Sequence, residues 1–139
     1  MKNKRGSKGD IMTCKVIQTE RAPKAIGPYS QGIVAAPWLF VSGQLGMLPE
    51  TGDLVGADFS PQARQALENL LQIVEAAGYD STDVVAVDVF VTDLNHFAAF
   101  NDIYTEYFSV HRPARAVVEV CRLPKDAVVE IKCVACRKG

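Results

Sequence analysis

Residues 112–136 read RPARAVVEVCRLPKDAVVEIKCVAC, and the predicted fold depends on this stretch. It contains two runs rich in valine and isoleucine, Arg115–Cys121 and Val128–Cys136, joined by a six-residue turn that includes a proline. Runs of β-branched residues bounded by turn residues are typical of strands. The stretch therefore predicts two strands that pair around the turn, with Cys121 opposite Val128.

Two charged side chains on these strands form the first candidate site. Because side chains alternate along a strand, the predicted pairing places Arg115 and Glu130 on the same face of the sheet. Their Cα atoms would lie about 13 Å apart, at about 3.3 Å per residue. A guanidinium and a carboxylate so placed can hold a small anion and deliver a water molecule to it. A slip of one residue in the register would separate the two side chains.

The same register places Glu119 directly opposite Glu130. Like charges at directly opposed positions destabilise a strand pair. Either the register is offset or one of the two carboxyl groups has a raised pKa, and both alternatives stay open at this point.

The rest of the chain predicts two helices and four further strands. Ser60 followed by Pro61 is typical of a helix N-terminus, apolar residues at helical spacing follow, and Gly78 is the expected stop. A second helix is expected from Phe97 or Ala98 to Phe108. The other expected strands are Cys14–Gln18, Gly32–Ala35, Trp38–Ser42 and Asp83–Val91, the last with Val85, Val87, Val89 and Val91 on one side.

The predicted element order is βββαβαββ, which favours an α+β fold with two helices on one face of a mainly antiparallel sheet. Valine and isoleucine are available to both faces of several strands. We therefore expect the face without helices to pack against other subunits.

Composition favours one small domain without a general affinity for a polyanion. The 139 residues include 15 basic and 16 acidic ones, for a net charge of −1, so neither nucleic acid nor an anionic membrane is an expected partner. Residues 1–11 are basic and lack apolar periodicity, and we expect them to be a disordered extension before a single domain over 12–139. No secretory signal pattern or apolar run of about 18 residues is present, so we expect a cytoplasmic protein.

Four cysteines raise the question of a metal site or a disulfide. Cys133 and Cys136 are three residues apart on a predicted strand, so their side chains point to opposite faces and cannot grip one ion. We expect buried free thiols and no metal site. Neither His96 nor His111 has a partner signature that would favour a catalytic role.

Several segments together resemble one family. The matching segments are Ala25–Gln31 (AIGPYSQ), Val41–Gln44 (VSGQ), Thr51–Asp53 (TGD), Gln62–Asn69 (QARQALEN), Val91–Leu94 (VTDL), Arg112–Arg115 (RPAR), Val118–Val120 (VEV), and Leu123–Asp126 (LPKD) continuing to Val129–Ile131 (VEI). From about Thr19 to Arg137 the chain resembles the Rid family of reactive-intermediate deaminases, close to its RidA-type members.

This resemblance implies a chorismate-mutase-like α+β fold that assembles as a barrel-like homotrimer with ligand clefts between subunits. It also implies hydrolysis of small 2-imino acids, which are reactive enamine/imine intermediates, to 2-keto acids and ammonia. Imines already hydrolyse in water, so a modest acceleration suffices and no cofactor is expected.

The resemblance also assigns residue roles. Arg115 corresponds to the carboxylate-binding arginine and Glu130 to the acid that orients water. Tyr29, Ser42, Gly43 and Asn101 correspond to pocket positions. Val117 stands where some RidA-type members have cysteine, and its backbone can still face the ligand.

Two other classes of function remain open. The same clefts can hold a small carboxylate without turnover, as a binding or regulatory protein would. Some family members are described as RNA-cleaving inhibitors of translation, but the sequence has no basic stripe and its aromatic residues lie at core spacing rather than as a stacking platform.

Overall fold

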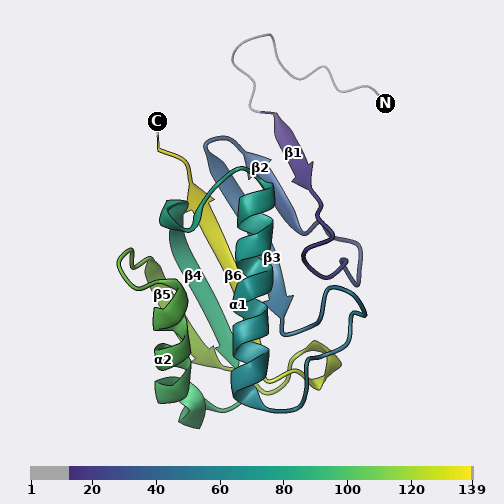
Figure 1. Cartoon of the computed structure of the whole chain (residues 1–139), viewed down its shortest axis with the longest axis vertical. Coiled ribbons are helices and arrows are strands. Elements are labelled where there is room, and N and C mark those ends of the chain that lie inside the picture. The colour runs from purple at the N-terminus through teal and green to yellow at the C-terminus, as the bar shows by residue number, and fades with distance from the viewer. Residues whose placement is uncertain (1–12, 139) are drawn as a thin grey trace.

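The computed structural model describes residues 13–138 (Figure 1). Its strands and longer helices follow the predicted order βββαβαββ. They are β1 Cys14–Ile17, β2 Gly32–Ala35, β3 Trp38–Leu45, α1 Phe59–Ala76, β4 Val84–Val91, α2 Phe97–Tyr107, β5 Ala114–Glu119 and β6 Val129–Cys136. Short 3₁₀ turns precede β4, α2 and β6.

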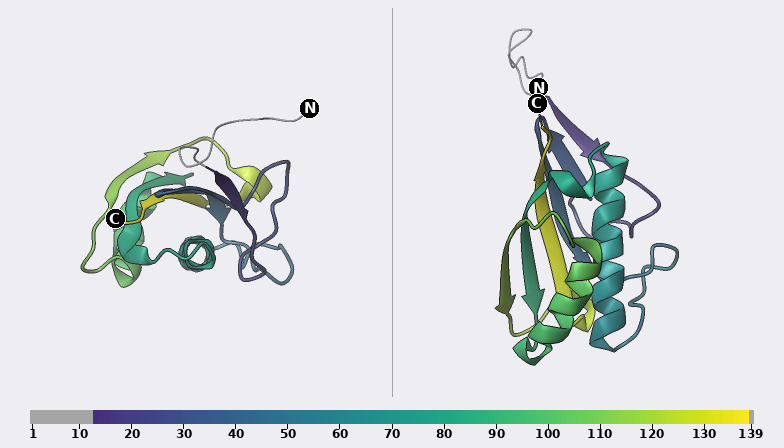
Figure 2. Two further views of the ribbon diagram at one scale, coloured as in Figure 1. Left: turned by 90° about the horizontal axis from the view of Figure 1, so that it is seen from above. Right: turned by 60° about the vertical axis from the view of Figure 1, so that its left-hand side comes forward.

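The six strands form one mixed sheet in the order β1-β2-β3-β6-β4-β5. All neighbouring strands are antiparallel except β4 and β5, which are parallel. A parallel pair needs a crossover connection, and α2 supplies it. Both helices lie on the same side of the curved sheet, as the view from above makes plain (Figure 2). The α+β prediction is therefore confirmed.

The predicted pairing of the last two strands is wrong, because β4 lies between them. β6 pairs with β4 on one side and β3 on the other, while β5 pairs only with β4 at the sheet edge. β4 has buried valines at alternate positions, and a strand of this kind is best placed inside a sheet, where both of its edges are hydrogen-bonded. Closeness in sequence does not outweigh that preference.

This arrangement also removes the predicted clash of carboxylates. Glu119 pairs with Val91 of β4 and is separated from Glu130 by that strand. Its Oε1 atom accepts a hydrogen bond of 2.9 Å from the backbone N–H of Leu94, at the start of the turn before α2. The two carboxylates therefore do not face each other, and the structure contains no β5–β6 hairpin whose register could be offset.

The main core lies between the sheet and the helices. The apolar face of α1 packs on β3 and β6, and α2 adds Phe100, Ile103 and Tyr104. On β4 the predicted stripe holds for Val87, Val89 and Val91, all about 1% exposed. Val85 departs from it, because a register shift between Val84 and Ala86 turns Val85 outward and Val84 inward.

Helix α1 begins one residue before the predicted N-cap. Asp58, not Ser60, is the N-cap residue, and its side chain makes no capping hydrogen bond. Gly78 follows the helix with a φ of 83°, in the left-handed region that favours glycine, so the predicted stop is confirmed. Neither helix within residues 13–138 is long and apolar enough to cross a membrane.

Among residues 13–138 no helix covers the second face of the sheet, and this face carries large apolar side chains. We call it the open face. Phe40 pairs with Val134 on β6 and with Ile33 on β2, and Ile33 pairs with Val16, so these four side chains lie in one row across the sheet. Phe40 is 48% exposed and Val16 60%. The prediction that residues 1–11 are a disordered extension lies outside the described residues.

Candidate functional site

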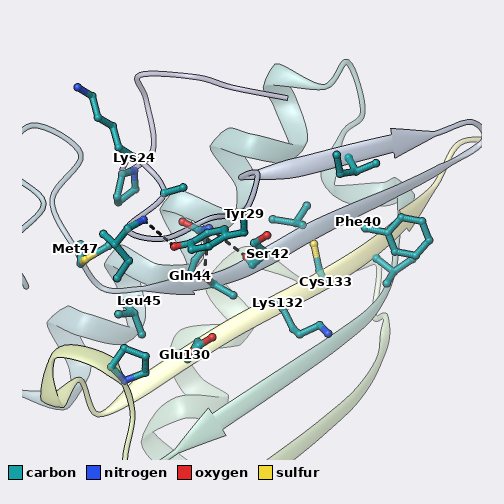
Figure 3. A pocket seen from close by; sticks show the side chains of 18 residues that line it. Lys24, Tyr29, Phe40, Ser42, Gln44, Leu45, Met47, Glu130, Lys132 and Cys133 are labelled. Atoms are coloured by element: carbon teal, nitrogen blue, oxygen red, sulfur yellow. Dashed lines mark hydrogen bonds between the residues drawn. The ribbon is translucent and has the colours of Figure 1, made fainter. Parts of the chain in front are cut away.

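A cleft of about 530 Å³ lies on the open face, where β3 and β6 meet the loop of residues 23–29 (Figure 3). Four of the predicted site residues line it: Tyr29, Ser42, Gly43 and Glu130. Lys24 and Met47 lie at the loop end of the cleft, and Lys132 lies farther along β6 (Figure 3). We call this hollow the Glu130 cleft.

The floor of the Glu130 cleft is a bulge in β3. The pairing of β3 with β6 shifts between Val41 and Gln44, so Ser42 and Gly43 fall between paired positions. Ser42 is held in place by its hydroxyl, which donates to the carbonyl of Ser30 at 2.6 Å, and by its N–H, which donates to the carbonyl of Gln31 at 2.9 Å. The bulge explains why β3 extends beyond the predicted end at Ser42.

Glu130 is half-buried at this bulge. Burial raises the pKa of its carboxyl group above the ordinary value, and the nearby charge of Lys132 offsets only part of that rise. Within residues 13–138 its carboxylate has no hydrogen-bond donor and no ion-pair partner. A partly desolvated, unpaired carboxylate in a cleft is typical of a proton acceptor in a reaction.

The loop over the cleft is fixed by a buried glutamine that sequence reasoning missed. Gln31 is 4% exposed, and its Nε2 group donates to the carbonyls of Ala22 and Pro23 at 3.3 and 2.8 Å. Tyr29, on the same loop, is exposed at the rim, and its hydroxyl accepts a hydrogen bond from the N–H of Ile26 at 3.1 Å. Gln31 ends the AIGPYSQ segment, but nothing in that segment indicates that its side chain fixes the loop.

A second hollow, of about 350 Å³, contains the other predicted residues. Arg115 and Asn101 line it together with Tyr104, Thr105, Phe108, Arg112 and Pro113. The Nη2 group of Arg115 donates to Oδ1 of Asn101 at 2.8 Å. The guanidinium carbon lies 4.7 Å from the centroid of the Tyr104 ring. We call this hollow the Arg115 pocket.

The Glu130 cleft and the Arg115 pocket lie on opposite sides of the sheet, so the prediction that Arg115 and Glu130 share a face is wrong for a single chain. Arg115 pairs with Val87, which pairs with Cys133, and this row faces the helices. Glu130 pairs with Phe90, which pairs with Val118, and this row faces away from them. Compared with the predicted pairing, β4 lies between β5 and β6, so Arg115 is one strand farther from Glu130 and its side chain is on the other face.

Val117 lies two residues beyond Arg115 on the same face. Its side chain is half-buried and packs against the main core. It is thus on the Arg115 side of the molecule, although it does not line the Arg115 pocket. Its proposed ligand contact stays a prediction.

The remaining candidate residues have structural surroundings. His96 stacks on Phe59 with ring centroids 4.4 Å apart, and His111 contacts the carbonyl of Val84. All four cysteines are free, but only Cys133 is buried, so the expectation of buried thiols is wrong for Cys14 and Cys121, which are exposed, and for Cys136, which is intermediate. Burial raises the pKa of Cys133 to about 12, so it remains a thiol. Cys133 and Cys136 point to opposite faces as predicted, and no metal-binding cluster occurs in the described part of the chain.

The fold and the two hollows define a small α+β protein with cavities beside the sheet, and comparisons with known proteins place the chain in a family. The family described as Endoribonuclease L-PSP matches residues 19–137. A RutC family protein of Pyrococcus horikoshii is 52% identical over 121 residues, covering 87% of this chain and 96% of the relative. The 2-iminobutanoate/2-iminopropanoate deaminase of Bos taurus is 46% identical over 121 residues, covering 87% of this chain and 88% of the relative.

A solved structure agrees with this assignment. Escherichia coli TdcF with bound serine superposes with a TM-score of 0.85 at 46% identity, covering 89% of this chain and 99% of that one. The chain therefore belongs to the Endoribonuclease L-PSP family, the Rid family whose motifs it carries.

Proposed function

We propose that this protein hydrolyses small 2-imino acids to 2-keto acids and ammonia, in a site that two copies of the chain complete. The proposal is supported by membership in a family with deaminases among its named members and by the carboxylate of Glu130, which is unpaired within residues 13–138 and has a raised pKa. The observation that carries the two-copy site is the placement of Arg115 and Glu130 on opposite faces of the sheet. Only a neighbouring copy can bring an Arg115 pocket to a Glu130 cleft.

The open face offers a surface for such an assembly. Trp38, Phe40 and Val118 are each more than 40% exposed there, and exposed apolar patches of this kind are typical of subunit contacts. We propose a homotrimer in which this face is covered by neighbouring copies. The trimer is the assembly implied by the family resemblance.

In the proposed mechanism Arg115 binds the carboxylate of the imino acid through paired N–H donors. Charge-assisted hydrogen bonds contribute about 1.5–3 kcal/mol each. A lysine in this position would lack the planar fork that fixes the orientation of the carboxylate. The imine carbon is thereby held at a fixed distance from the carboxylate-binding end of the site.

Glu130 from the neighbouring copy then acts as the base. It takes a proton from a water molecule as the water oxygen bonds to the imine carbon, and the electron pair of the C=N double bond moves to nitrogen. Glu130 returns that proton to nitrogen, which gives a carbinolamine. Glu130 then takes the proton of the carbinolamine hydroxyl and passes it to the amino nitrogen, so that the C–N bond breaks, ammonia leaves and the keto group forms. A positioned acid–base group contributes about 10²–10⁴ in rate. No step of this sequence calls for a metal or an organic cofactor.

Mixing of two inactive variants tests both the reaction and the two-copy site. Arg115→Ala and Glu130→Ala should each lose the release of 2-ketobutyrate from freshly generated 2-iminobutanoate. When equal amounts are unfolded and refolded together, about a quarter of the sites should regain both residues by random assembly. Arg115→Ala mixed with the double variant Arg115→Ala/Glu130→Ala is the control and should regain nothing.

Two outcomes would contradict the proposal. A parent protein that does not accelerate imine loss would reject the reaction. An active parent whose mixed variants stay inactive would reject the two-copy site and leave the reaction standing.

Carboxylate binding without turnover is the second candidate, favoured by the serine bound to Escherichia coli TdcF. It predicts that calorimetry detects 2-ketobutyrate binding to the parent and to Glu130→Ala but not to Arg115→Ala, with no turnover in any of them. We expect no nucleic-acid partner, and salt-dependent RNA binding by the full chain would contradict that expectation.

A further inference from the structure

The guanidinium of Arg115 contacts aromatic rings and an amide, and it has no acidic partner within residues 13–138. Its guanidinium carbon lies 4.7, 5.7 and 5.8 Å from the ring centroids of Tyr104, Phe100 and Phe97. Among residues 13–138 its side chain donates one hydrogen bond, to the amide oxygen of Asn101. None of the ion pairs formed among residues 13–138 involves Arg115.

The four contacting residues come from one face of α2. Phe97, Phe100, Asn101 and Tyr104 stand at positions i, i+3, i+4 and i+7, which line one side of a helix. We call them the α2 shelf. Since β5 is the edge strand beside α2, the side chain of Arg115 reaches from the sheet edge onto this shelf.

Tyr104 has the shelf ring that lies nearest to the Arg115 guanidinium. It is 7% exposed, and its ring packs between Phe100 and Phe108 with centroid separations of 5.6 and 4.9 Å. Its hydroxyl is buried and has no hydrogen-bond partner in the described part of the chain. Burial raises its pKa to about 12, with the Arg115 charge only partly offsetting the rise, so the ring is neutral at physiological pH. The ring face rather than the hydroxyl is what Tyr104 offers to Arg115.

We propose that Tyr104 is a positioning residue that holds the guanidinium of Arg115 face-on against the α2 shelf and so keeps its free N–H edge ready for the carboxylate of a small monocarboxylate ligand. The inference deepens the proposed function, on which its catalytic meaning rests. A guanidinium over an aromatic ring gains about 0.5–2 kcal/mol without losing its charge to a counter-ion. Only one of its five N–H donors is engaged by Asn101, so a forked contact to a carboxylate remains available.

The neutral contacts of Arg115 also affect how tightly a carboxylate should bind. Because the groups of the same chain that hold Arg115 within residues 13–138 are neutral, the incoming carboxylate has no acid of that chain to displace. Preorganisation of this kind lowers the entropy cost of binding, so its loss should weaken affinity more than it slows the chemical step.

Two variants at one position provide the test. Tyr104→Leu removes the ring, and Tyr104→Phe keeps the ring and removes the unpartnered hydroxyl. The first measurement is the ¹H–¹⁵N signal of the Arg115 Nε–Hε group, identified by its disappearance in Arg115→Lys. We expect a ring-current shift and low mobility in the parent, their loss in Tyr104→Leu, and their recovery in Tyr104→Phe.

The second measurement is affinity for 2-ketobutyrate by calorimetry, together with KM and kcat. Tyr104→Leu should weaken binding and raise KM by about 2–30-fold, with a smaller change in kcat. Tyr104→Phe should recover both values. If Tyr104 had a purely structural role, Tyr104→Leu would lower the unfolding temperature but leave the Arg115 signal and the affinity of the folded protein unchanged. That result would overturn the proposal.

If Tyr104→Leu does not fold, Phe97→Leu decides, because Phe97 is 43% exposed and its ring contributes little to the core. It should shift the Arg115 signal in the same direction by less, and an unmoved signal would reject the α2 shelf. The NMR measurement does not depend on turnover. A parent that hydrolyses no imine would therefore reject the proposed function while the positioning of Arg115 is still tested.

Discussion

Gly43 lies directly against the carboxylate of Glu130. A Cβ atom added to Gly43 would lie 2.8 Å from Cδ of Glu130 and would overlap Oε2. The bulge in β3 brings the two residues together, although 87 positions separate them in the chain. The position of the proposed base therefore depends on the absence of a side chain on the neighbouring strand.

Gly43→Ala should displace Glu130 without unfolding the protein. The overlapping atoms belong to the end of a flexible side chain, which can rotate away, so we expect an unfolding temperature close to that of the parent. Since an acid–base group contributes about 10²–10⁴ in rate, we expect kcat for 2-iminobutanoate to fall at least about tenfold. The double variant Gly43→Ala/Glu130→Ala should be no slower than Glu130→Ala alone, and additive losses would refute displacement as the cause.

Gly46→Ala is the matched contrast. Here the added Cβ would lie 2.5 and 2.6 Å from the backbone O and Cα atoms of Gln62 on α1, which cannot move without shifting the helix. We expect a loss of about 1–3 kcal/mol in the free energy of unfolding, measured with urea. A stability equal to that of Gly43→Ala would show that α1 is not tightly docked on β3.

The raised pKa of Glu130 predicts a specific pH dependence. A base must be deprotonated to act, so kcat/KM should fall as the pH drops through a value above the ordinary 4.5. Stopped-flow measurement of imine loss in the parent and in Glu130→Gln checks this, because the variant should lack that limb. An acid limb at or below 4.5 would contradict the effect of burial.

The same shift makes Glu130 a cost to stability at neutral pH. A carboxyl group whose folded pKa is raised favours the folded state below its unfolded pKa, and that contribution is lost as the pH rises through the folded pKa. Glu130→Gln should therefore be more stable than the parent at pH 7 in thermal unfolding. The difference should shrink as the pH falls toward 4, and a difference that grows would have the wrong sign.

Asn101→Asp should convert the neutral partner of Arg115 into a competing anion. The aspartate would stand within hydrogen-bond distance of Nη2, where Asn101 Oδ1 now lies at 2.8 Å, and would form an ion pair. We expect KM for 2-iminobutanoate to rise about tenfold or more, since the substrate carboxylate must displace the aspartate. Asn101→Ala serves as the control and should raise KM less, because it removes one hydrogen bond and adds no charge; equal effects would count against competition.

Much of the fold was predictable because its signals are local. Apolar spacing located α1 and α2, and Gly78 marked the end of α1 because the chain there needs a positive φ. The observed bounds of each strand lie within a few residues of the predicted ones. Two predictions were wrong: the direction of Val85 and the length of β3. Both errors lie at bulges, and a bulge depends on the partner strand rather than on the residues that form it.

The candidate site was predictable only in its parts. Motif resemblance selected Tyr29, Ser42, Gly43 and Glu130, and these do gather in one cleft, while Arg115 and Asn101 meet in another. Strand alternation alone could not join the two halves, because the predicted register assumed that sequence neighbours pair. Gln31 and Tyr104 have structural tasks that their own sequence surroundings do not reveal.

By itself the sequence determined the order of elements, the alternation of side chains along each strand outside its bulges, and the family. The tertiary structure decided which strands pair, and hence that β4 lies between β5 and β6 with Arg115 and Glu130 on opposite faces. The physical reason is that alternation is a property of the local backbone, whereas pairing is chosen by burial and hydrogen bonding across the whole sheet.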